Sequence, residues 1–275
     1  LFRSVPVDVI DVAGLVPGAH EGKGLGNQLL DDLRQADALI HVVDFAGSTN
    51  EKGEPIEPGI YDPFNDIKFL EDEIDHWYFG IINKGWERFA RQVQQEHIDI
   101  CKALGKQLSG LKVTEEMVED IVKKLNLNKE TPNNWTDNNL FDIARELRKI
   151  TKPMIIAANK MDLPSAVKNY QRIKTEHPEI NVIACSAESE LALKEAAKNG
   201  LIKYIPGESD FEIIGNANEK QKNALEFIRK NVVSAGGTGV QSAINFAVLG
   251  ILKYIAIFPG GVNKLTDQYG RTLPD

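Results

Sequence analysis

The stretch Pro153-Met-Ile-Ile-Ala-Ala-Asn-Lys-Met-Asp162 joins a short apolar run to a polar turn. Its first part, Pro153–Ala158, has the length and composition of a strand buried on both faces. Three similar runs, each ending at a polar residue or a turn, occur at Val5–Ile10, Ala38–Val43 and Asn181–Ala184. Helical patterns separate most of these runs, and this alternation predicts βαβ units. The expected fold class is therefore α/β, with a mostly parallel sheet flanked by helices.

The polar turn after Pro153–Ala158 is a candidate site, because ligands of such sheets bind at the carboxyl ends of the strands. It contains Asn159, Lys160 and Asp162. A carboxylate at Asp162 can accept hydrogen bonds from N1–H and the exocyclic amine of guanine. Adenine lacks both donors and would leave the carboxylate unpaired, which costs roughly 1–3 kcal/mol or more. The Lys160 stem can lie along the base plane, and Asn159 can bond N7 and brace neighbouring loops.

A second candidate turn, Asp11-Val12-Ala13-Gly14, follows the run Val5–Ile10. A carboxylate at a strand end is well placed to hold a Mg²⁺ hydration shell, usually through water. A glycine three positions later lets a backbone N–H approach a terminal phosphate. Asp11 is therefore the candidate metal-binding residue and Gly14 the candidate phosphate sensor. An ordinary strand-ending aspartate with a turn glycine is the alternative.

Residues 15–27 follow this turn and contain four glycines in nine positions. Such backbone freedom costs folding entropy and suits a loop that rearranges with a bound nucleotide. A flexible surface loop is the alternative. The third candidate turn, Ser186-Ala187-Glu188, comes just after Asn181–Cys185, where a small loop lets a backbone N–H reach the guanine carbonyl oxygen. By itself this tripeptide is weak evidence for a nucleotide site, and it supports one only because it follows the third predicted strand.

Residues 61–150 have a different pattern, in which apolar residues recur every three or four positions. This spacing predicts a long amphipathic helix or a helical hairpin, followed by two further helices. Asp62-Pro63, Thr114 and Thr136 are expected to begin these helices, since capping residues precede helix-period patterns. The insertion is either a lid that packs on its host or an arm that contacts a partner.

The last part of the chain is predicted to be mainly helical. Expected elements are helices near Leu191–Asn199, at Glu219–Val232 with Asn218 as its cap, and at about Val240–Leu252 after Gly236-Gly237-Thr238-Gly239, and a strand at Tyr254–Phe258. The motif G-x-x-x-x-G-K-[ST] of a phosphate-binding P-loop is absent from the 275 residues. The chain starts at Leu1 and stops at Asp275 without a cap or polar tail. We therefore expect a piece of a longer protein, with its P-loop before Leu1 and no activity of its own. A chain that does not hydrolyse nucleotide is the alternative.

D-x-x-G, N-K-x-D and S-A, each after a predicted strand and in this order, resemble the motifs of P-loop GTPases. The stretches Asp11–Asn27 and Asp31–Asp44, together with the helical insertion, resemble the Obg-like GTPases, in particular the YchF-type branch in its archaeal form. The tail Phe258–Asp267 is similar to the entry of that family's C-terminal TGS domain. The resemblance covers essentially the whole chain. It implies a G domain in two parts, 1–60 and 151–253, a helical insertion at 61–150, and the start of a TGS domain at 254–275.

The resemblance also implies a function: Mg²⁺-dependent binding and slow hydrolysis of a purine nucleoside triphosphate, in association with ribosomes or translation factors. The family lacks the glutamine that orients the attacking water in Ras-like proteins. Leu15 stands at that place here and cannot orient water. By resemblance, His20 is the candidate residue for orienting the attacking water, and a loop histidine without a catalytic part is the alternative. Many YchF-type proteins depart from N-K-x-D and accept ATP. This chain keeps Asn159, Lys160 and Asp162, so GTP is expected and ATP is the alternative.

Composition limits the other classes. The net charge is −8, which does not favour a general nucleic-acid coat. Two cysteines cannot form a disulfide framework, and no signal peptide or clean membrane span is visible, so a cytoplasmic protein is expected. A scaffold that docks on RNA or a ribosomal protein is the second hypothesis. Its candidate RNA-contact residues are Lys123, Lys124, Arg145, Arg148, Lys149 and Lys152.

Overall fold

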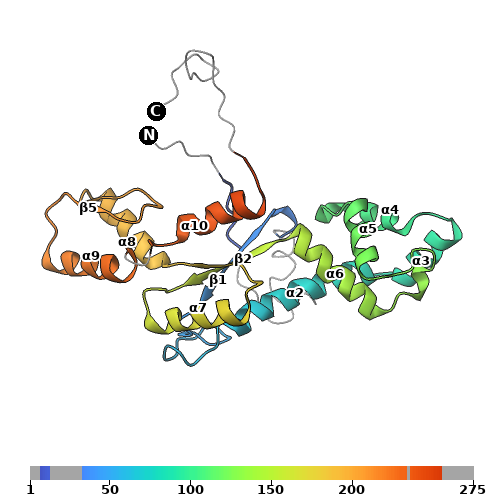
Figure 1. The fold of residues 1–275 in the computed structure, drawn as a ribbon, viewed down its shortest axis with the longest axis horizontal. Coiled ribbons are helices and arrows are strands. Elements are labelled where there is room, and N and C mark those ends of the chain that lie inside the picture. The colour runs from blue at the N-terminus through green and yellow to red at the C-terminus, as the bar shows by residue number, and fades with distance from the viewer. Residues whose placement is uncertain (1–6, 13–32, 234–235, 256–275) are drawn as a thin grey trace, which may run out of the picture.

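The structure is a computed structural model that describes residues 7–12, 33–233 and 236–255. A parallel sheet lies at its centre, with strands β1 (Leu39–Asp44), β2 (Met154–Asn159) and β3 (Val182–Ala184) in the order β1-β2-β3 (Figure 1). Leu39 pairs with Met154 at one end of the β1–β2 ladder, and Asp44 pairs with Asn159 at the other. The carboxyl ends of β1 and β2 are therefore level. This sheet, flanked by helices, confirms the predicted α/β class.

Helices fill the connection from β1 to β2. They are α2 (Phe64–Asn83), α3 (Trp86–Gln95), α4 (Ile100–Gln107), the 3-10 turn η2 (Ser109–Leu111), α5 (Glu115–Lys124), the 3-10 turn η3 (Pro132–Asn134) and α6 (Asp137–Thr151). After β2 come α7 (Pro164–Glu176), β3, α8 (Ala187–Lys198), β4 (Ile202–Lys203), β5 (Glu212–Ile213), α9 (Glu219–Asn231), α10 (Val240–Asn245) and the π-helical segment η5 (Phe246–Ile251).

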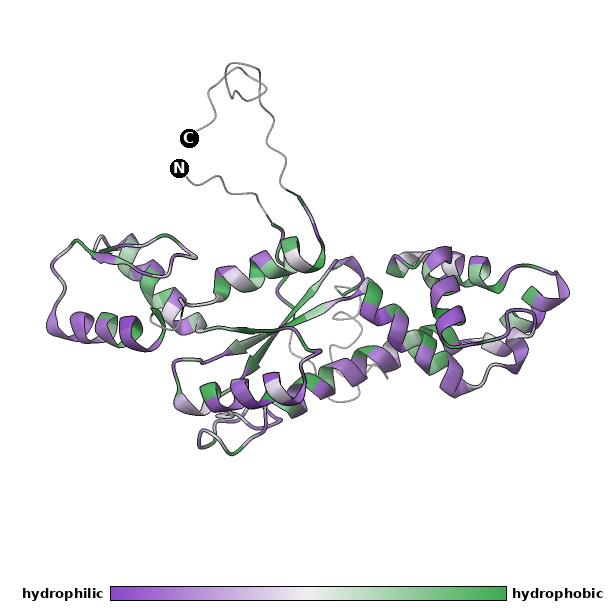
Figure 2. Ribbon diagram, in the orientation of Figure 1, coloured by the Kyte–Doolittle hydropathy of each residue, from purple (hydrophilic) through white to green (hydrophobic). Residues whose placement is uncertain are grey.

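Both faces of β2 are covered by helices. Ile156 packs with Ala166 and Ile173 of α7 on one face, and Ile155 packs with Ala243 of α10 on the other. Because successive side chains of a strand point to opposite faces, a strand covered on both sides has to be apolar throughout. Figure 2 shows this directly, since the strands are predominantly apolar while the helices carry both apolar and polar stripes.

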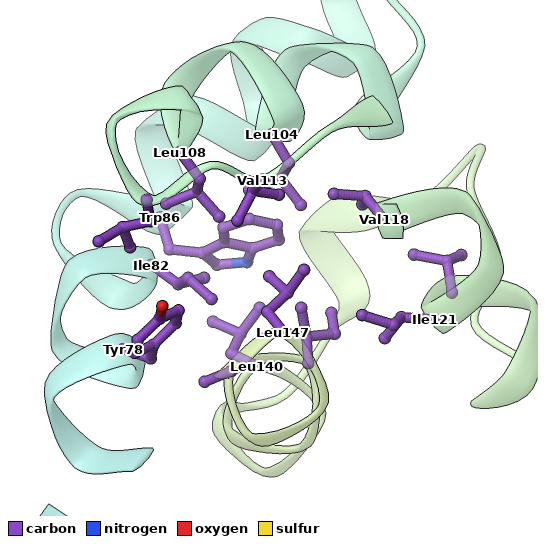
Figure 3. Packing of buried hydrophobic residues seen from close by; sticks show 14 of the residues in the cluster. Tyr78, Ile82, Trp86, Leu104, Leu108, Val113, Val118, Ile121, Leu140 and Leu147 are labelled. Atoms are coloured by element: carbon purple, nitrogen blue, oxygen red, sulfur yellow. The ribbon is translucent and has the colours of Figure 1, made fainter. Parts of the chain in front are cut away.

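The helices α2–α6 surround a core of their own, which we call the helical cluster. Figure 3 shows its centre, where Trp86 is surrounded by aliphatic side chains of α4–α6, Leu104, Val118 and Leu147 among them. The rings of Trp86 and Trp135 stack with centroids 5.6 Å apart. Burial of this many large apolar side chains, at about 1.5–3 kcal/mol each, explains how the segment holds together away from the sheet.

Two of the expected helix starts have the predicted caps, and the helix expected at Asp62-Pro63 begins one residue later, at Phe64. Thr114 caps α5 by accepting a hydrogen bond from Met117 N, and Thr136 forms a capping box with Asn139 at the start of α6. The long apolar stripe that begins in α2 is broken after Asn83, because Gly85 has a φ of +77° that no helix allows. The structure thus forms α2 and α3 in place of one continuous helix.

A smaller lobe lies at the other end of the sheet from the helical cluster (Figure 1). It consists of α8, β4, β5 and α9, and its core includes Leu193, Tyr204, Phe211 and Leu225. Helix α9 begins at the predicted cap, since Asn218 Oδ1 accepts a hydrogen bond from Gln221 N and Asn218 N donates one to Gln221 Oε1. This lobe connects β3 to α10.

Three sequence predictions differ from the structure. Val7–Ile10 form no strand, and Val7, Val9 and Ile10 are exposed. An apolar run becomes a strand only where a neighbour supplies hydrogen-bond partners, and no described strand pairs with this one. Tyr254 and Ile255, at the start of the predicted strand Tyr254–Phe258, are also irregular, and the rest of it lies outside the described residues. Helix α8 begins at Ala187, four residues earlier than expected, because Ser186 takes the N-cap position.

The basic residues near the end of α6 are less available than the sequence suggests. Arg148 is 4% exposed, and its Nε donates to Asp75 Oδ1 at 2.7 Å. Lys152 is fully buried, and its Nζ donates to the backbone oxygens of Arg34 and Ala36 at 3.0 and 2.6 Å. Burial lowers the pKa of Lys152 to about 8. These two cations therefore bond to groups in the interior and are not presented to solvent.

Three more of these cations lie at the surface next to carboxylates. Lys124 and Lys149 both pair with Glu146, and Arg145 lies 3.7 Å from Asp142. Two of the six candidate residues are therefore buried and three lie beside carboxylates, while Lys123 is exposed. None of the helices in the described ranges has the length and hydropathy needed to cross a bilayer.

Candidate functional site

The turns after β2 and β3 are held together by backbone hydrogen bonds. Cys185 N donates to Ala158 O at 2.8 Å, and Met161 N donates to Cys185 O at 3.1 Å. Lys160, between these contacts, has a φ of +65°, a left-handed conformation that is uncommon for residues with a side chain. The two hydrogen bonds to Cys185 thus hold the turn Asn159–Asp162 in a conformation that includes the left-handed Lys160.

Side chains of the two predicted turns also contact each other. Ser186 Oγ donates to Asp162 Oδ1 at 2.9 Å, and Ala187 N donates to Asn159 Oδ1 at 3.0 Å. Ser186 is almost fully buried, whereas Ala187 and Glu188 are exposed. The structure therefore brings Asn159 and Asp162 into contact with Ala187 and Ser186, and Asp162 and Ser186 are 24 positions apart along the chain.

The Asp162 carboxylate is only partly used by the protein. Within the described residues its Oδ1 has Ser186 as a partner, and its Oδ2 has no hydrogen-bond partner. A free carboxylate oxygen beside a fixed one suits a ligand that presents two adjacent N–H donors, as guanine does at N1 and the exocyclic amine. The Ala187 N–H, in contrast, is already bonded to Asn159, so a guanine carbonyl would have to share it.

Lys160 belongs to a second group of polar contacts, which sequence reasoning missed. Its Nζ lies 3.0 Å from Asp44 Oδ2 and 2.7 Å from Ser48 Oγ. Asp44 also accepts hydrogen bonds from the backbone N–H groups of Ala46 and Ser48. Burial acts to raise the pKa of Asp44, but the bonds from Ser48, Lys160 and Thr49 outweigh it and hold the pKa below its usual value.

A sequence signal for Asp44 existed, since it directly follows the apolar run of β1 as Asn159 follows that of β2. The carboxyl ends of β1 and β2 are paired at these two residues. The rule that predicted a site after β2 therefore also selects Asp44. The contact of Asp44 with Lys160, however, depends on the direction in which the Lys160 side chain points, and the sequence pattern does not show this direction.

The remaining candidates are less closely defined. Asp11 is exposed in an irregular segment and makes no hydrogen bond or ion pair with any described residue. Its neighbour Val12 packs against the helical cluster. Gly14 and His20 lie outside the described residues. The structure thus shows how the two turns after β2 and β3 contact each other. The binding of a base by these turns, and of phosphate and Mg²⁺ by Asp11, Gly14 and His20, stays a prediction.

Comparison with known proteins bears on the identity of the chain. Residues 157–261, which include the turns at Asn159–Asp162 and Ser186–Glu188, match the family model of the Obg-like GTPase YGR210-like, G4 motif-containing domain. The whole chain is 50% identical, over 277 aligned residues, to the uncharacterized GTP-binding protein MJ1332 of Methanocaldococcus jannaschii and covers 68% of it.

A crystal structure of a GTP binding protein from Pyrococcus horikoshii OT3 matches with a TM-score of 0.70 and 40% identity, over 90% of this chain and 65% of that one. The ribosome-binding ATPase YchF of Buchnera aphidicola is more distant, at 26% identity over 84% of this chain and 57% of that protein. The chain spans about two thirds of the length of the two archaeal relatives. The whole of this chain aligns with MJ1332 at 50% identity, and residues 157–261 match the Obg-like model. The chain therefore belongs to the Obg-like family of GTP-binding proteins.

Proposed function

We propose that this chain is the base-reading part of a nucleoside triphosphatase that works as a molecular switch with a preference for GTP. One observation carries the proposal: Asp162 is fixed through Oδ1 by Ser186 and keeps Oδ2 without a partner among the described residues. In this arrangement Asp162 accepts the two adjacent donors of guanine, and Asn159 braces the turn after β3 through Ala187.

The phosphate side of the proposed site uses residues named from the sequence. Asp11 would hold Mg²⁺ through water, the Gly14 N–H would sense the terminal phosphate, and His20 would position the attacking water. Mg²⁺, when bound, would neutralise the charge that develops on the phosphate oxygens. A P-loop, whose motif is absent from these 275 residues, would complete this site. What supports this assignment is the order of the motifs along the chain, with D-x-x-G before N-K-x-D and S-A, as in the P-loop GTPases that the sequence resembles.

An ATP-preferring member of the YchF-type branch is the second candidate. The name of the Buchnera relative, a ribosome-binding ATPase, favours it. The retained Asn159, Lys160 and Asp162 favour GTP, since adenine would leave Asp162 Oδ2 without a partner. The same name supports a ribosome or a translation factor as the macromolecular partner, with the helical cluster and a TGS domain starting near 254 as the surfaces that reach it. We propose a cytoplasmic location on the same basis.

A competition experiment on the intact protein tests the base assignment. Fluorescent GTP is bound in the presence of Mg²⁺ and displaced with unlabelled GTP, ATP or xanthosine triphosphate. We expect GTP to compete far better than ATP. Equal or better competition by ATP would overturn the guanine assignment and place the protein with the ATP-using members.

The substitution Asp162→Asn provides a control that separates lost recognition from lost folding. The asparagine amide cannot accept from two donors, so the preference for GTP should disappear. Xanthine carries a carbonyl in place of the exocyclic amine, and the asparagine NH₂ can donate to it. We therefore expect xanthosine triphosphate to bind the variant better than the parent, which a misfolded protein could not do.

A further inference from the structure

A buried group of polar side chains lies behind the turn Ser186–Glu188 and has no part in the base contacts proposed above. At its centre is Glu190 of α8, which is 4% exposed. Its Oε2 accepts hydrogen bonds from Thr238 Oγ1 at 2.5 Å and from Tyr204 Oη at 2.7 Å. Its Oε1 is buried and accepts no hydrogen bond from any described residue, and Lys194 Nζ of the same helix lies 3.4 Å from it.

Thr238 connects this group to the backbone of the site. It belongs to the loop Gly236–Gly239, which leads into α10, and it is 3% exposed. Its carbonyl oxygen accepts the hydrogen bond of Ser186 N at 2.8 Å. The residue that fixes Asp162 is therefore itself fixed by Thr238.

The loop approaches the end of β3 so closely that only glycine fits beside Thr238. Gly239 has a φ of +74°, and a Cβ at this position would lie 1.7 Å from Ala184 O. A backbone oxygen cannot yield by that distance, so any side chain at 239 would push the loop away from Ala184 and Cys185. The contact between the two backbones is thus built into the fold at two successive residues.

We propose that Thr238, held in place by Glu190 and Tyr204, is a positioning residue for base selection by Asp162. The order of contacts carries the argument: Glu190 fixes the Thr238 hydroxyl, the Thr238 carbonyl fixes Ser186 N, and Ser186 Oγ fixes Asp162. The inference rests on the proposed function, because it gives Thr238 a role only through that site. Thr238 is too deeply buried to reach a base itself.

Loosening of Thr238 should affect recognition of the base more than binding of the triphosphate. A carboxylate that is free to turn accepts two donors less well, whereas contacts to phosphate do not involve Asp162. A hydrogen bond to a buried carboxylate that is lost without replacement changes an equilibrium roughly tenfold or more. We therefore expect the ratio of GTP to ATP affinity to fall by about tenfold on removal of the Thr238 hydroxyl.

The experiment compares Thr238→Val with Thr238→Ser in the intact protein. Valine matches the shape of threonine without the hydroxyl, and serine keeps the hydroxyl. Thr151→Val is a matched control, since Thr151 is also buried and lies 2.7 Å from a tyrosine hydroxyl, that of Tyr78 in the helical cluster. Competition of GTP and ATP against fluorescent GTP is measured for each, and amide hydrogen exchange of residues 184–189 is followed without nucleotide.

We expect Thr238→Val to lower the ratio of GTP to ATP affinity and to speed hydrogen exchange at the Ser186 amide. Thr238→Ser, which keeps the hydroxyl, should leave both as in the parent. Thr151→Val should lower the denaturation midpoint and leave ratio and exchange as in the parent. If Thr238→Val does not fold, Tyr204→Phe, which removes one donor to Glu190, is expected to shift both readouts in the same direction.

The outcomes separate this inference from the proposed function. A parent protein without any preference for GTP contradicts the proposed function, and the exchange data still decide whether Thr238 orders Ser186. A parent that prefers GTP, with Thr238→Val or Tyr204→Phe unchanged in both ratio and exchange, overturns the positioning role alone. An equal fall of the GTP-to-ATP affinity ratio in Thr151→Val would also overturn the positioning role. The fall would then result from lower stability of the protein and not from the contacts of Thr238.

Discussion

Lys160 Nζ lies 3.0 Å from Asp44 Oδ2, so the turn after β2 is tied to the end of β1 by a charge-assisted hydrogen bond. The two residues are 116 positions apart and are separated by the entire helical cluster. Lys160 also has a left-handed backbone, which its neighbours must maintain. Asp44 therefore holds the lysine whose stem is proposed to lie along the base.

Removal of the Asp44 charge should weaken nucleotide binding through Lys160. For Asp44→Asn we expect roughly tenfold weaker binding of GTP, since bonds to charged groups contribute about 1.5–3 kcal/mol. A double-mutant cycle with Lys160→Met should show that the two losses do not add, because both remove the same contact. Asp62→Asn, which removes a surface carboxylate paired with Arg172, is the control and should bind as the parent does. Fully additive losses would contradict the coupling.

The ion pair between Asp75 and Arg148 predicts a large effect on stability. Both side chains are 4% exposed, and the guanidinium cannot lose its proton. Asp75→Asn should lower the free energy of unfolding by about 3–5 kcal/mol, because it leaves the buried Arg148 with only the partly exposed Glu71, 3.5 Å away, as an anionic partner. Asp142→Asn removes an exposed partner of Arg145 and should cost no more than about 0.5 kcal/mol. Urea unfolding of both variants measures the difference, and similar losses would argue against burial as the cause.

His41 on β1 predicts a loss of stability in acid. Its Nδ1 is enclosed and has no partner among the described residues, and burial lowers the pKa of His41 to about 4. The unfolded chain takes up a proton near pH 6.5 while the folded one does not, so stability falls as the pH drops from about 6.5 to 4. The pKa difference sets an upper limit of about 3 kcal/mol for this loss. His41→Leu should flatten the dependence in denaturant titrations between pH 7 and 4, and an unchanged slope would refute the assignment.

Two glycines should respond to alanine in opposite directions. Gly47 has a φ of +59°, and a Cβ there would lie 2.2 Å from Tyr61 O, so Gly47→Ala should destabilise the protein by more than about 1 kcal/mol. Gly80 lies inside α2 with open space around its Cα, so Gly80→Ala should stabilise it by about 0.5–1 kcal/mol. Thermal unfolding of the pair measures both signs. A loss of stability in Gly80→Ala would mean that a bend in α2 is needed there.

The sequence by itself determined the local elements of this protein. Apolar runs of fixed length predicted β1, β2 and β3, and cap residues such as Thr136 and Asn218 predicted where helices begin. The turns at Asn159 and Ser186 were visible because chemistry at the end of a strand follows the strand along the chain. These features depend on neighbours within a few positions, which a linear pattern records.

Only the tertiary structure decided which distant groups meet. It paired Arg148 with Asp75 and buried Lys152, although both cations looked like surface charge in the sequence. It left Val7–Ile10 without a strand, since pairing depends on a partner and not on the run itself. It also placed Asp44 beside Lys160 and Thr238 behind Ser186. Hydrogen bonds and ion pairs act over a few ångströms of space at any separation along the chain, so folding alone selects them.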